Sequence, residues 1–165
     1  ASIDTGDAEL VTRQLLADER TKLNWSVPRV LMSKNKVKVL LNLCLLADAT
    51  IPRGGVLTVT STGEEDKIAF RVEAKGTNAR LAATIPTLLA GETEEGAIDA
   101  RAIQAYYTGL VARACDLDLS VASDPDVVAF EARPAANVAS APETGDEAAD
   151  AAPEALADAP QNAVA

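Results

Sequence analysis

The 165-residue sequence contains no histidine, and aromatic residues make up only 3% of it. The first absence excludes any imidazole acid, base or zinc ligand from the chain, and with it every Ser-His-Asp or Cys-His nucleophile. The second argues against a base-stacking surface for single-stranded nucleic acid. No basic residue follows Arg133, and the net charge of −10 repels phosphate backbones and anionic lipid surfaces. We therefore expect neither nucleic acid nor a membrane as a partner.

Cysteine and long apolar runs are also scarce. Cys44 and Cys115 lie in apolar helical contexts with no nearby partner, so we expect two small core residues in a reducing compartment. Polar residues interrupt the longest apolar neighbourhood, residues 37–49, which is shorter than the roughly 18 residues of a membrane span. The N-terminus has no secretory signal and no initiator Met, so the sequence is interpreted as a fragment of a longer protein.

The composition changes sharply after residue 133. Residues 134–165 are mostly Ala, Pro, Asp and Glu and hold 6 of the 25 acidic residues but few large aliphatic ones. Such a segment has too little apolar surface to offset the entropy of ordering, so we predict a disordered acidic Ala/Pro-rich tail. Transient Ala-rich helices between its prolines are the alternative. Residues 1–133 are then one domain.

The first 49 residues predict two helices and a strand between them. Asp7 can cap a helix that ends near residue 17. Residues 22–27 alternate polar and apolar side chains, which predicts a strand with Trp25 on its buried face. Ser33 can cap a second helix that ends near residue 49. The side chains expected to face the core are Ala8, Leu10, Val11 and Leu15 in the first helix, and Val37, Leu40, Leu41, Cys44 and Leu45 in the second.

The rest of the domain predicts two hairpins and two more helices, in this order: strands over 56–60 and 67–74, a short helix over 86–90, an acidic loop over 91–96, a helix from Asp99, and strands over 117–123 and 127–132. The expected core stripe of the last helix is Ile103, Tyr107, Leu110, Val111 and Ala114. Amphipathic rather than fully apolar strands imply an α+β fold, a two-layer sandwich with a five-stranded mixed sheet and three to four helices on one face.

This order of elements resembles the ATP-binding domain of sensor histidine kinases, the Bergerat or GHKL fold, over most of residues 5–133. In that family an Asn of the N box holds Mg²⁺ against the nucleotide, and the matching position here is Leu46, which cannot ligate a metal. Ala74 replaces the Asp that recognises adenine, and Asn78 replaces the second Gly of the same box. Residues 98–103 lack the phosphate-binding glycines. The resemblance thus predicts a pseudo-ATPase with no cofactor and no metal.

Residues 23–25, 49–56 and 73–76 resemble the C-terminal domain of ChpT-type histidine phosphotransferases. The resemblance implies a cytoplasmic homodimer, in which two N-terminal helices of each subunit form a bundle that carries the phospho-accepting His. It also implies transfer from the receiver domain of a hybrid kinase such as CckA to the receivers of response regulators such as CtrA and CpdR. With no His of its own, this chain is expected to be the receiver-docking half, not catalytic by itself and neither an ATPase nor a kinase.

Six residues are candidates for partner binding. Lys34 and Lys38 could steer an acidic receiver face, or they could form an ordinary solvated helix face. Lys75, Asn78 and Arg80 lie in the loop that matches the nucleotide lid, where a receiver could dock, or where a polar loop needs no function.

The sixth candidate is Tyr106, which adjoins Tyr107 in the last helix, so only one of the two can lie on the core stripe. We expect Tyr107 to be buried and Tyr106 exposed, either against a partner or packed at the sheet edge. Two other functions stay open for the chain as a whole. One is a degenerate GHKL domain that still binds a nucleotide, and the other is a purely structural interaction module.

Overall fold

The computed structural model describes residues 1–93 and 99–136 of the chain. Ala1–Pro134 form one compact unit. Its elements are β1 (Ser2–Asp4), α1 (Thr5–Leu16), β2 (Thr21–Ser26), β3 (Leu31–Ser33), α2 (Lys34–Asp48), β4 (Gly55–Thr62), a 3₁₀ turn (Glu65–Lys67), β5 (Ala69–Lys75), α3 (Ile85–Leu89), α4 (Ala100–Ala114), β6 (Leu117–Asp124) and β7 (Val127–Pro134).

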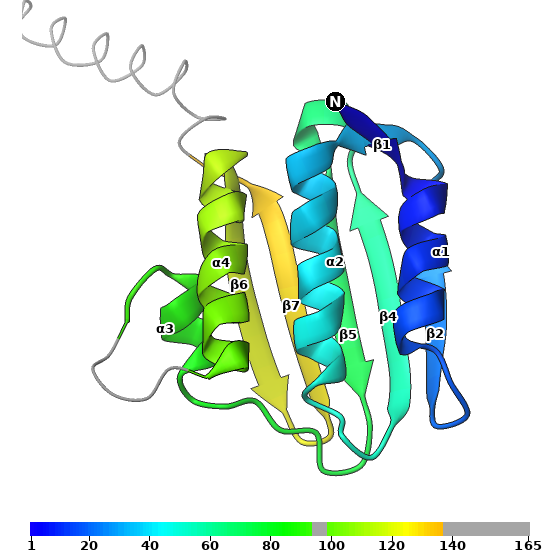
Figure 1. Ribbon diagram of the computed structural model, residues 1–165, viewed down its shortest axis with the longest axis vertical. Helices are drawn as coiled ribbons and strands as arrows, with labels where there is room; N and C mark the ends of the chain where they lie inside the picture. Colours follow the sequence, from blue (N-terminus) through cyan, green and yellow to red (C-terminus); the bar gives the residue numbers. More distant parts are fainter. Residues whose placement is uncertain (94–98, 137–165) are drawn as a thin grey trace, which may run out of the picture. The chain divides into compact units, whose positions relative to one another are not determined.

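The main sheet has five strands in the order β2-β4-β5-β7-β6. Only β2 and β4 pair in parallel, so the sheet is mixed. Helices α1, α2 and α4 lie along one face of it (Figure 1). Strand residues alternate accordingly: Leu57 and Val59 of β4 are buried, while Arg71 of β5 pairs with Glu131 of β7 on the open face. The predicted two-layer α+β sandwich is confirmed.

Two sequence predictions fall partly outside the described residues. Of the predicted tail, residues 137–165 lie outside them, and so do residues 94–98 of the acidic loop. Strand β7 continues through Pro134, which pairs with Leu117 of β6. The last strand therefore runs two residues beyond its predicted end.

The helix α1 buries a different face from the one predicted. Its buried residues are Thr5, Ala8, Thr12 and Leu16, whereas Leu10, Val11 and Leu15 are exposed. Asp4, rather than Asp7, caps the helix by accepting a hydrogen bond from the Gly6 N–H at 2.6 Å. Only Ala8 of the predicted face is buried, because the small and hydroxyl-bearing side chains let α1 lie close to its neighbours.

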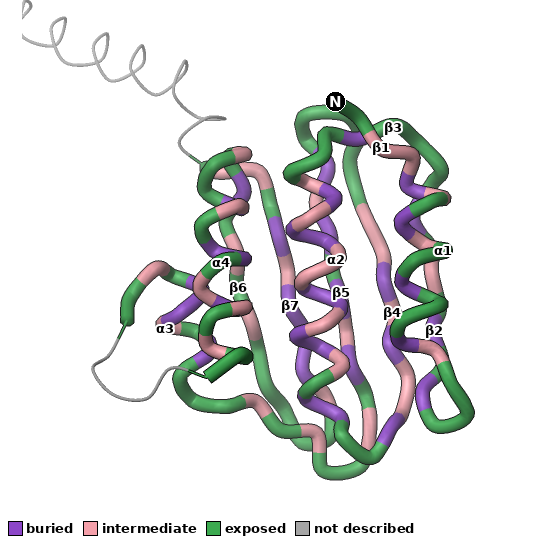
Figure 2. The backbone as a smooth tube through the Cα atoms, in the orientation of Figure 1, coloured by how far each residue is buried: buried purple, intermediate pink, exposed green. Residues whose placement is uncertain are grey.

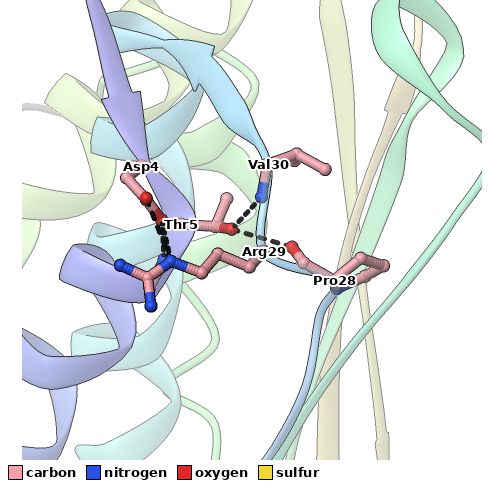
Figure 3. Close-up of polar contacts among 6 residues, drawn as sticks. Asp4, Thr5, Pro28, Arg29 and Val30 are labelled. Atoms are coloured by element: carbon pink, nitrogen blue, oxygen red, sulfur yellow. Dashed lines mark hydrogen bonds and ion pairs between the residues drawn. The ribbon is translucent and has the colours of Figure 1, made fainter.

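A polar contact that the sequence did not predict ties the start of α1 to the chain that follows β2 (Figure 3). The hydroxyl of Thr5, which is fully buried, donates to the Pro28 carbonyl at 2.8 Å and accepts from the Val30 N–H at 2.9 Å. The Arg29 guanidinium donates to the Asp4 carboxylate at 3.0 Å. The hydrogen bond from Gly6 and this contact hold the pKa of Asp4 below its ordinary value. Beside them, β1 pairs with β3 in a small second sheet.

The helix α4 reverses the predicted orientation. Its buried residues are Ala105, Thr108, Gly109 and Ala112, while Ile103, Tyr107 and Leu110 of the predicted core stripe are exposed. Tyr107 is therefore the exposed tyrosine, and Tyr106 is the one that packs partly against the core. The prediction for this pair was wrong. The cause is close packing: a Cβ on Gly109 would lie 2.1 Å from the Leu89 carbonyl oxygen, so the face that meets α3 must be made of small residues.

Candidate functional site

Leu46 lies near the end of α2 and is 2% exposed. It forms part of the wall of a small cavity of about 240 Å³, as the replacement of a magnesium ligand by a core residue predicts. The cavity is lined by Leu46, Ala49, Thr50, Arg80, Ala82, Ile85, Arg101 and Phe130. This lining contains no carboxylate, and the Thr50 hydroxyl already donates to the Ala47 carbonyl at 2.6 Å. These residues do not fit a magnesium-bound nucleotide, because the hard oxygen ligands that magnesium needs are absent from them.

Lys75 is the last residue of β5, and hydrogen bonds from backbone N–H groups hold in place the loop that follows it, which contains Asn78 and Arg80. The Gly76 N–H donates to the Asp126 carbonyl at 3.0 Å, and the Asn78 N–H donates to the carboxylate of the same residue at 2.8 Å. The Arg80 N–H donates to the Thr50 carbonyl at 2.8 Å. Asn78 adopts a left-handed backbone with φ of 60°, which Asn tolerates better than most residues. All three candidate side chains are exposed.

The chain after this loop is fixed by α4. The Arg113 guanidinium donates to the Leu89 carbonyl at 3.0 Å, at the end of α3. Gly109 lies directly under the same carbonyl. The segment from residue 76 to residue 93 is therefore attached near both of its ends, to the β6–β7 turn through Asp126 and to α4 through Arg113.

The six candidate residues do not form one site. Lys75, Asn78 and Arg80 lie beyond the C-terminal end of α2, where Arg80 contacts Thr50. Lys34 and Lys38 lie in the first turns of α2, and its 15 residues extend over about 22 Å. Tyr106 is half-buried in α4. Sequence reasoning also missed Arg101, which joins Arg80 at the cavity, because a pattern cannot show which loop the first turn of α4 will face.

The helices α2 and α4 run in opposite directions (Figure 1). Arg101 at the start of α4 acts on Asp48 at the end of α2, and Lys36 at the start of α2 acts on Cys115 just after α4. Between these ends, the Gln104 amide donates to the Asn42 side chain at 3.3 Å. Burial and the neighbouring Asp18 raise the pKa of Asp48.

Both cysteines are free thiols. Burial raises the pKa of Cys44 to about 12, and burial also raises the pKa of Cys115, which is only half-buried. A thiol with a raised pKa holds little thiolate near neutral pH, and the thiolate is the nucleophile. Within residues 1–93 and 99–136, no cluster of three or more His, Cys, Asp or Glu could hold a metal ion. The same residues contain no helix that is both long enough and apolar enough to cross a membrane.

Comparison with solved structures identifies the class of fold. The mycobacterial sensor histidine kinase MprB superposes with a TM-score of 0.56 and 13% identity, covering 81% of this chain and 99% of that one. The catalytic domain of the histidine kinase ThkA gives 0.56 and 12%, covering 81% and 94%. At such identities the likeness establishes the fold alone, which is that of the GHKL-like catalytic domain of histidine kinases.

A family profile and two proteins of higher sequence identity show the family to which the chain belongs. The profile of the histidine phosphotransferase C-terminal domain matches residues 5–127, and the chain belongs to this family. It is 37% identical over 130 residues to the protein phosphotransferase ChpT of Brucella abortus (strain 2308), covering 79% of this chain and 62% of that protein. A bacterial phosphotransferase solved at 1.7 Å superposes with a TM-score of 0.73 and 36% identity, covering 80% and 64%. The chain thus spans less than two thirds of either relative.

Proposed function

We propose that this chain is the receiver-docking domain of a phosphorelay histidine phosphotransferase and that it binds no ATP. In this proposal the phosphoryl group moves between receiver domains through a His that is not part of the chain. The parent protein is a cytoplasmic homodimer, joined through N-terminal helices that carry this His. Its donor is a hybrid kinase such as CckA, and its acceptors are response regulators such as CtrA and CpdR.

The observation that carries the proposal is Leu46. A family with a kinase-like fold is expected to keep magnesium ligands only where it still uses a nucleotide. Leu46 is instead part of the core, and Ile85 and Phe130 are the other large apolar side chains at the same cavity. The chain also contains no His to receive a phosphoryl group from a receiver domain. The first feature favours a docking role over nucleotide chemistry, and the second agrees with a phosphoryl acceptor outside this chain.

The lid-like loop is the first part of the proposed receiver contact. Lys75, Asn78 and Arg80 present exposed side chains from a backbone that is already fixed by hydrogen bonds. A prearranged loop loses less conformational entropy when a partner binds. Lys34 and Lys38 would act from a distance, through steering of an acidic partner rather than through shared contacts.

Phosphotransfer tests the role of the chain. A receiver domain carrying phosphate on its aspartate is mixed with this chain, and with the Brucella abortus phosphotransferase ChpT as the positive control. We expect phosphate to appear on the control protein and not on this chain. Phosphate on this chain would show that it carries its own acceptor, and the assignment of roles would be wrong.

Nucleotide binding is the alternative from a different functional class, and thermal unfolding with magnesium-ATP tests it. A ligand at 100 times its Kd adds about 2.7 kcal/mol to the free energy of unfolding. We expect no shift in Tm. A clear rise would favour a degenerate GHKL domain that still binds a nucleotide. Failure of every receiver domain of the source organism to bind the chain would favour the third possibility, a structural module outside signalling.

A further inference from the structure

The helix α4 presents a line of large apolar side chains to solvent. Ile103, Tyr107 and Leu110 are 58%, 42% and 46% exposed, and their spacing of four and three residues places them on one side of the helix. We call these three residues the α4 stripe. At about 100° per residue they lie opposite the small buried residues of the same helix, and exposed and buried segments alternate along α4 (Figure 2). Apolar side chains that gather on one exposed face mark a contact surface more often than single ones do.

The charges next to the α4 stripe are all positive on the helix itself. The 15 residues of α4 include Arg101 and Arg113 but no Asp or Glu, although the whole chain carries a net charge of −10. The neighbouring helix α2 adds lysines at 34, 36 and 38, and Lys36 lies near enough to the C-terminal end of α4 to act on Cys115. The α4 stripe is therefore apolar at its centre and has mainly basic neighbours on α4 and α2, with the exposed N-cap carboxylate of Asp99 at one end.

The helix α1 also exposes leucines, but its surroundings differ. Leu10 and Leu15 share α1 with Asp7 and Glu9, and Arg13 is engaged by Glu9 at 2.9 Å. The exposed apolar side chains of α1 thus lie near two acidic residues and near Arg13, whose positive charge is paired with Glu9. This difference gives the two helices opposite preferences for a charged partner, and only α4 suits an acidic one.

We propose that the α4 stripe, together with the lysines of α2, is a docking surface for a receiver domain, through a receiver face that is apolar at its centre and carries carboxylates at its rim. The inference rests on the proposed function and extends it, since it adds a second contact surface to the lid-like loop. A second copy of the chain suits this surface poorly, because pairing two α4 stripes would bring like-charged borders together. An anionic membrane suits it poorly too, because the chain as a whole is strongly negative.

Binding of isolated receiver domains to the full chain tests the surface, with titration calorimetry as the measurement. The variants are Ile103→Asn and Leu110→Asn in α4. The matched control is Leu15→Asn in α1, where the leucine is 63% exposed. We expect each α4 variant to raise the Kd at least tenfold and the control to leave it within twofold. We also expect the Kd of the unaltered chain to rise with salt, as basic borders require. Far-ultraviolet circular dichroism and Tm identify the variants that are folded.

The outcomes separate this inference from the function on which it rests. If no receiver domain of the source organism binds the unaltered chain, the proposed function fails. If a receiver binds, and an Arg80→Ala variant weakens it while the α4 variants do not, the function stands and the α4 surface is overturned. Two further results would overturn it: sedimentation that shows a dimer lost in the α4 variants, or pelleting of the chain with vesicles of phosphatidylcholine and phosphatidylglycerol.

Discussion

The helices α2 and α4 each have 15 residues and lie side by side on the same face of the sheet, but they bury opposite kinds of side chain. In α2 the large aliphatic residues face inward, and Leu40, Leu43 and Leu46 are nearly inaccessible. In α4 the fully buried residues are small, and Ile103, Tyr107 and Leu110 face solvent. The two helices also have different neighbours: α2 lies over the central strands β4, β5 and β7, whereas α4 lies over the edge strand β6 and beside α3.

The short helix α3 explains the difference. It packs on α4 so closely that the Leu89 carbonyl lies over Gly109, and Arg113 of α4 donates to the same carbonyl. A large side chain at position 109 or 105 would push the two helices apart. The large apolar residues Ile103, Tyr107 and Leu110 of α4 therefore lie on its solvent-exposed side. The contact between α3 and α4 also fixes the end of the segment that follows β5.

The strongest test of this comparison is one substitution made in both helices. Leu46→Asn in α2 removes a buried aliphatic group and inserts an amide without partners, so we expect a loss of about 2 to 4 kcal/mol in the free energy of unfolding. Leu110→Asn in α4 replaces an exposed side chain, and we expect a loss below about 1 kcal/mol, mostly from helix propensity. Urea unfolding measures both.

The two variants carry the same change in helix propensity, so the difference between them reports burial alone. Equal losses would contradict the inward and outward assignments of these two leucines. An unchanged free energy for Leu46→Asn would place Leu46 at the mouth of an open pocket, and a ligand that fills this pocket would then become the better hypothesis.

A smaller effect is expected from Gly109→Ala. In an exposed helix this change would stabilise by up to about 1 kcal/mol. Here the new Cβ would lie 2.1 Å from the Leu89 carbonyl oxygen, and a backbone atom cannot move away cheaply. Overpacking of this kind costs roughly 1 to 3 kcal/mol, so we expect a net loss of about 1 to 2 kcal/mol in urea unfolding.

Gly6→Ala in α1 is the matched control for that variant. Its Cβ would meet the Arg29 side chain at 2.9 Å and an Asp4 carboxylate oxygen at 3.0 Å, and this ion pair at the surface can shift more easily than a backbone carbonyl. We expect a change within about 0.5 kcal/mol. If both variants behaved alike, close approach of α3 would not be the reason for the small inner face of α4.

The sequence predicted the order of the long helices and of the five main-sheet strands, the mixed sheet and the burial of Leu46, because these depend on local patterns and on one replaced residue. It did not predict the short strands β1 and β3, which pair with each other across the start of the chain. It failed at α1 and α4, where the apolar periodicity is real but faces solvent. A period of 3.6 residues identifies a stripe without telling which side the sheet lies on. The correct side depends on neighbours distant in the sequence, such as Leu89 for Gly109 and Val30 for Thr5.

The candidate site was predictable to a smaller extent. The loss of the magnesium ligand could be inferred from position 46, since the chemistry of one side chain decides it. The separation of Lys34 and Lys38 from the loop at Arg80 could not be inferred from the sequence, because it depends on the direction of α2 relative to the sheet. The exposed position of Tyr107 could not be inferred either, because it depends on the packing of α3 against α4.

The smallest effect is expected at the opposite end of α2 from its lysines. Asp48 lies in the last turn, where the helix dipole disfavours a negative charge, and burial together with Asp18 raises its pKa. A carboxyl whose pKa is raised by folding holds its proton more tightly in the folded state. Ionisation therefore weakens folding, and the cost appears as the pH rises from its ordinary value of 3.8 through the raised one. Asp48→Asn removes this cost, so we expect a gain of roughly 0.5 kcal/mol at pH 7 that vanishes near pH 3.

Tm measured across this pH range checks the sign. The curves of Asp48→Asn and the unaltered chain should meet at acid pH and separate as the pH rises. Asp7→Asn is the control, because Asp7 lies in the first turn of α1, where the dipole favours a negative charge, and its loss should not raise Tm. A lower Tm for Asp48→Asn at pH 7 would mean that the attraction between Asp48 and Arg101 outweighs burial. Attraction between these two charges, rather than packing, would then stabilise the position of the start of α4 against α2.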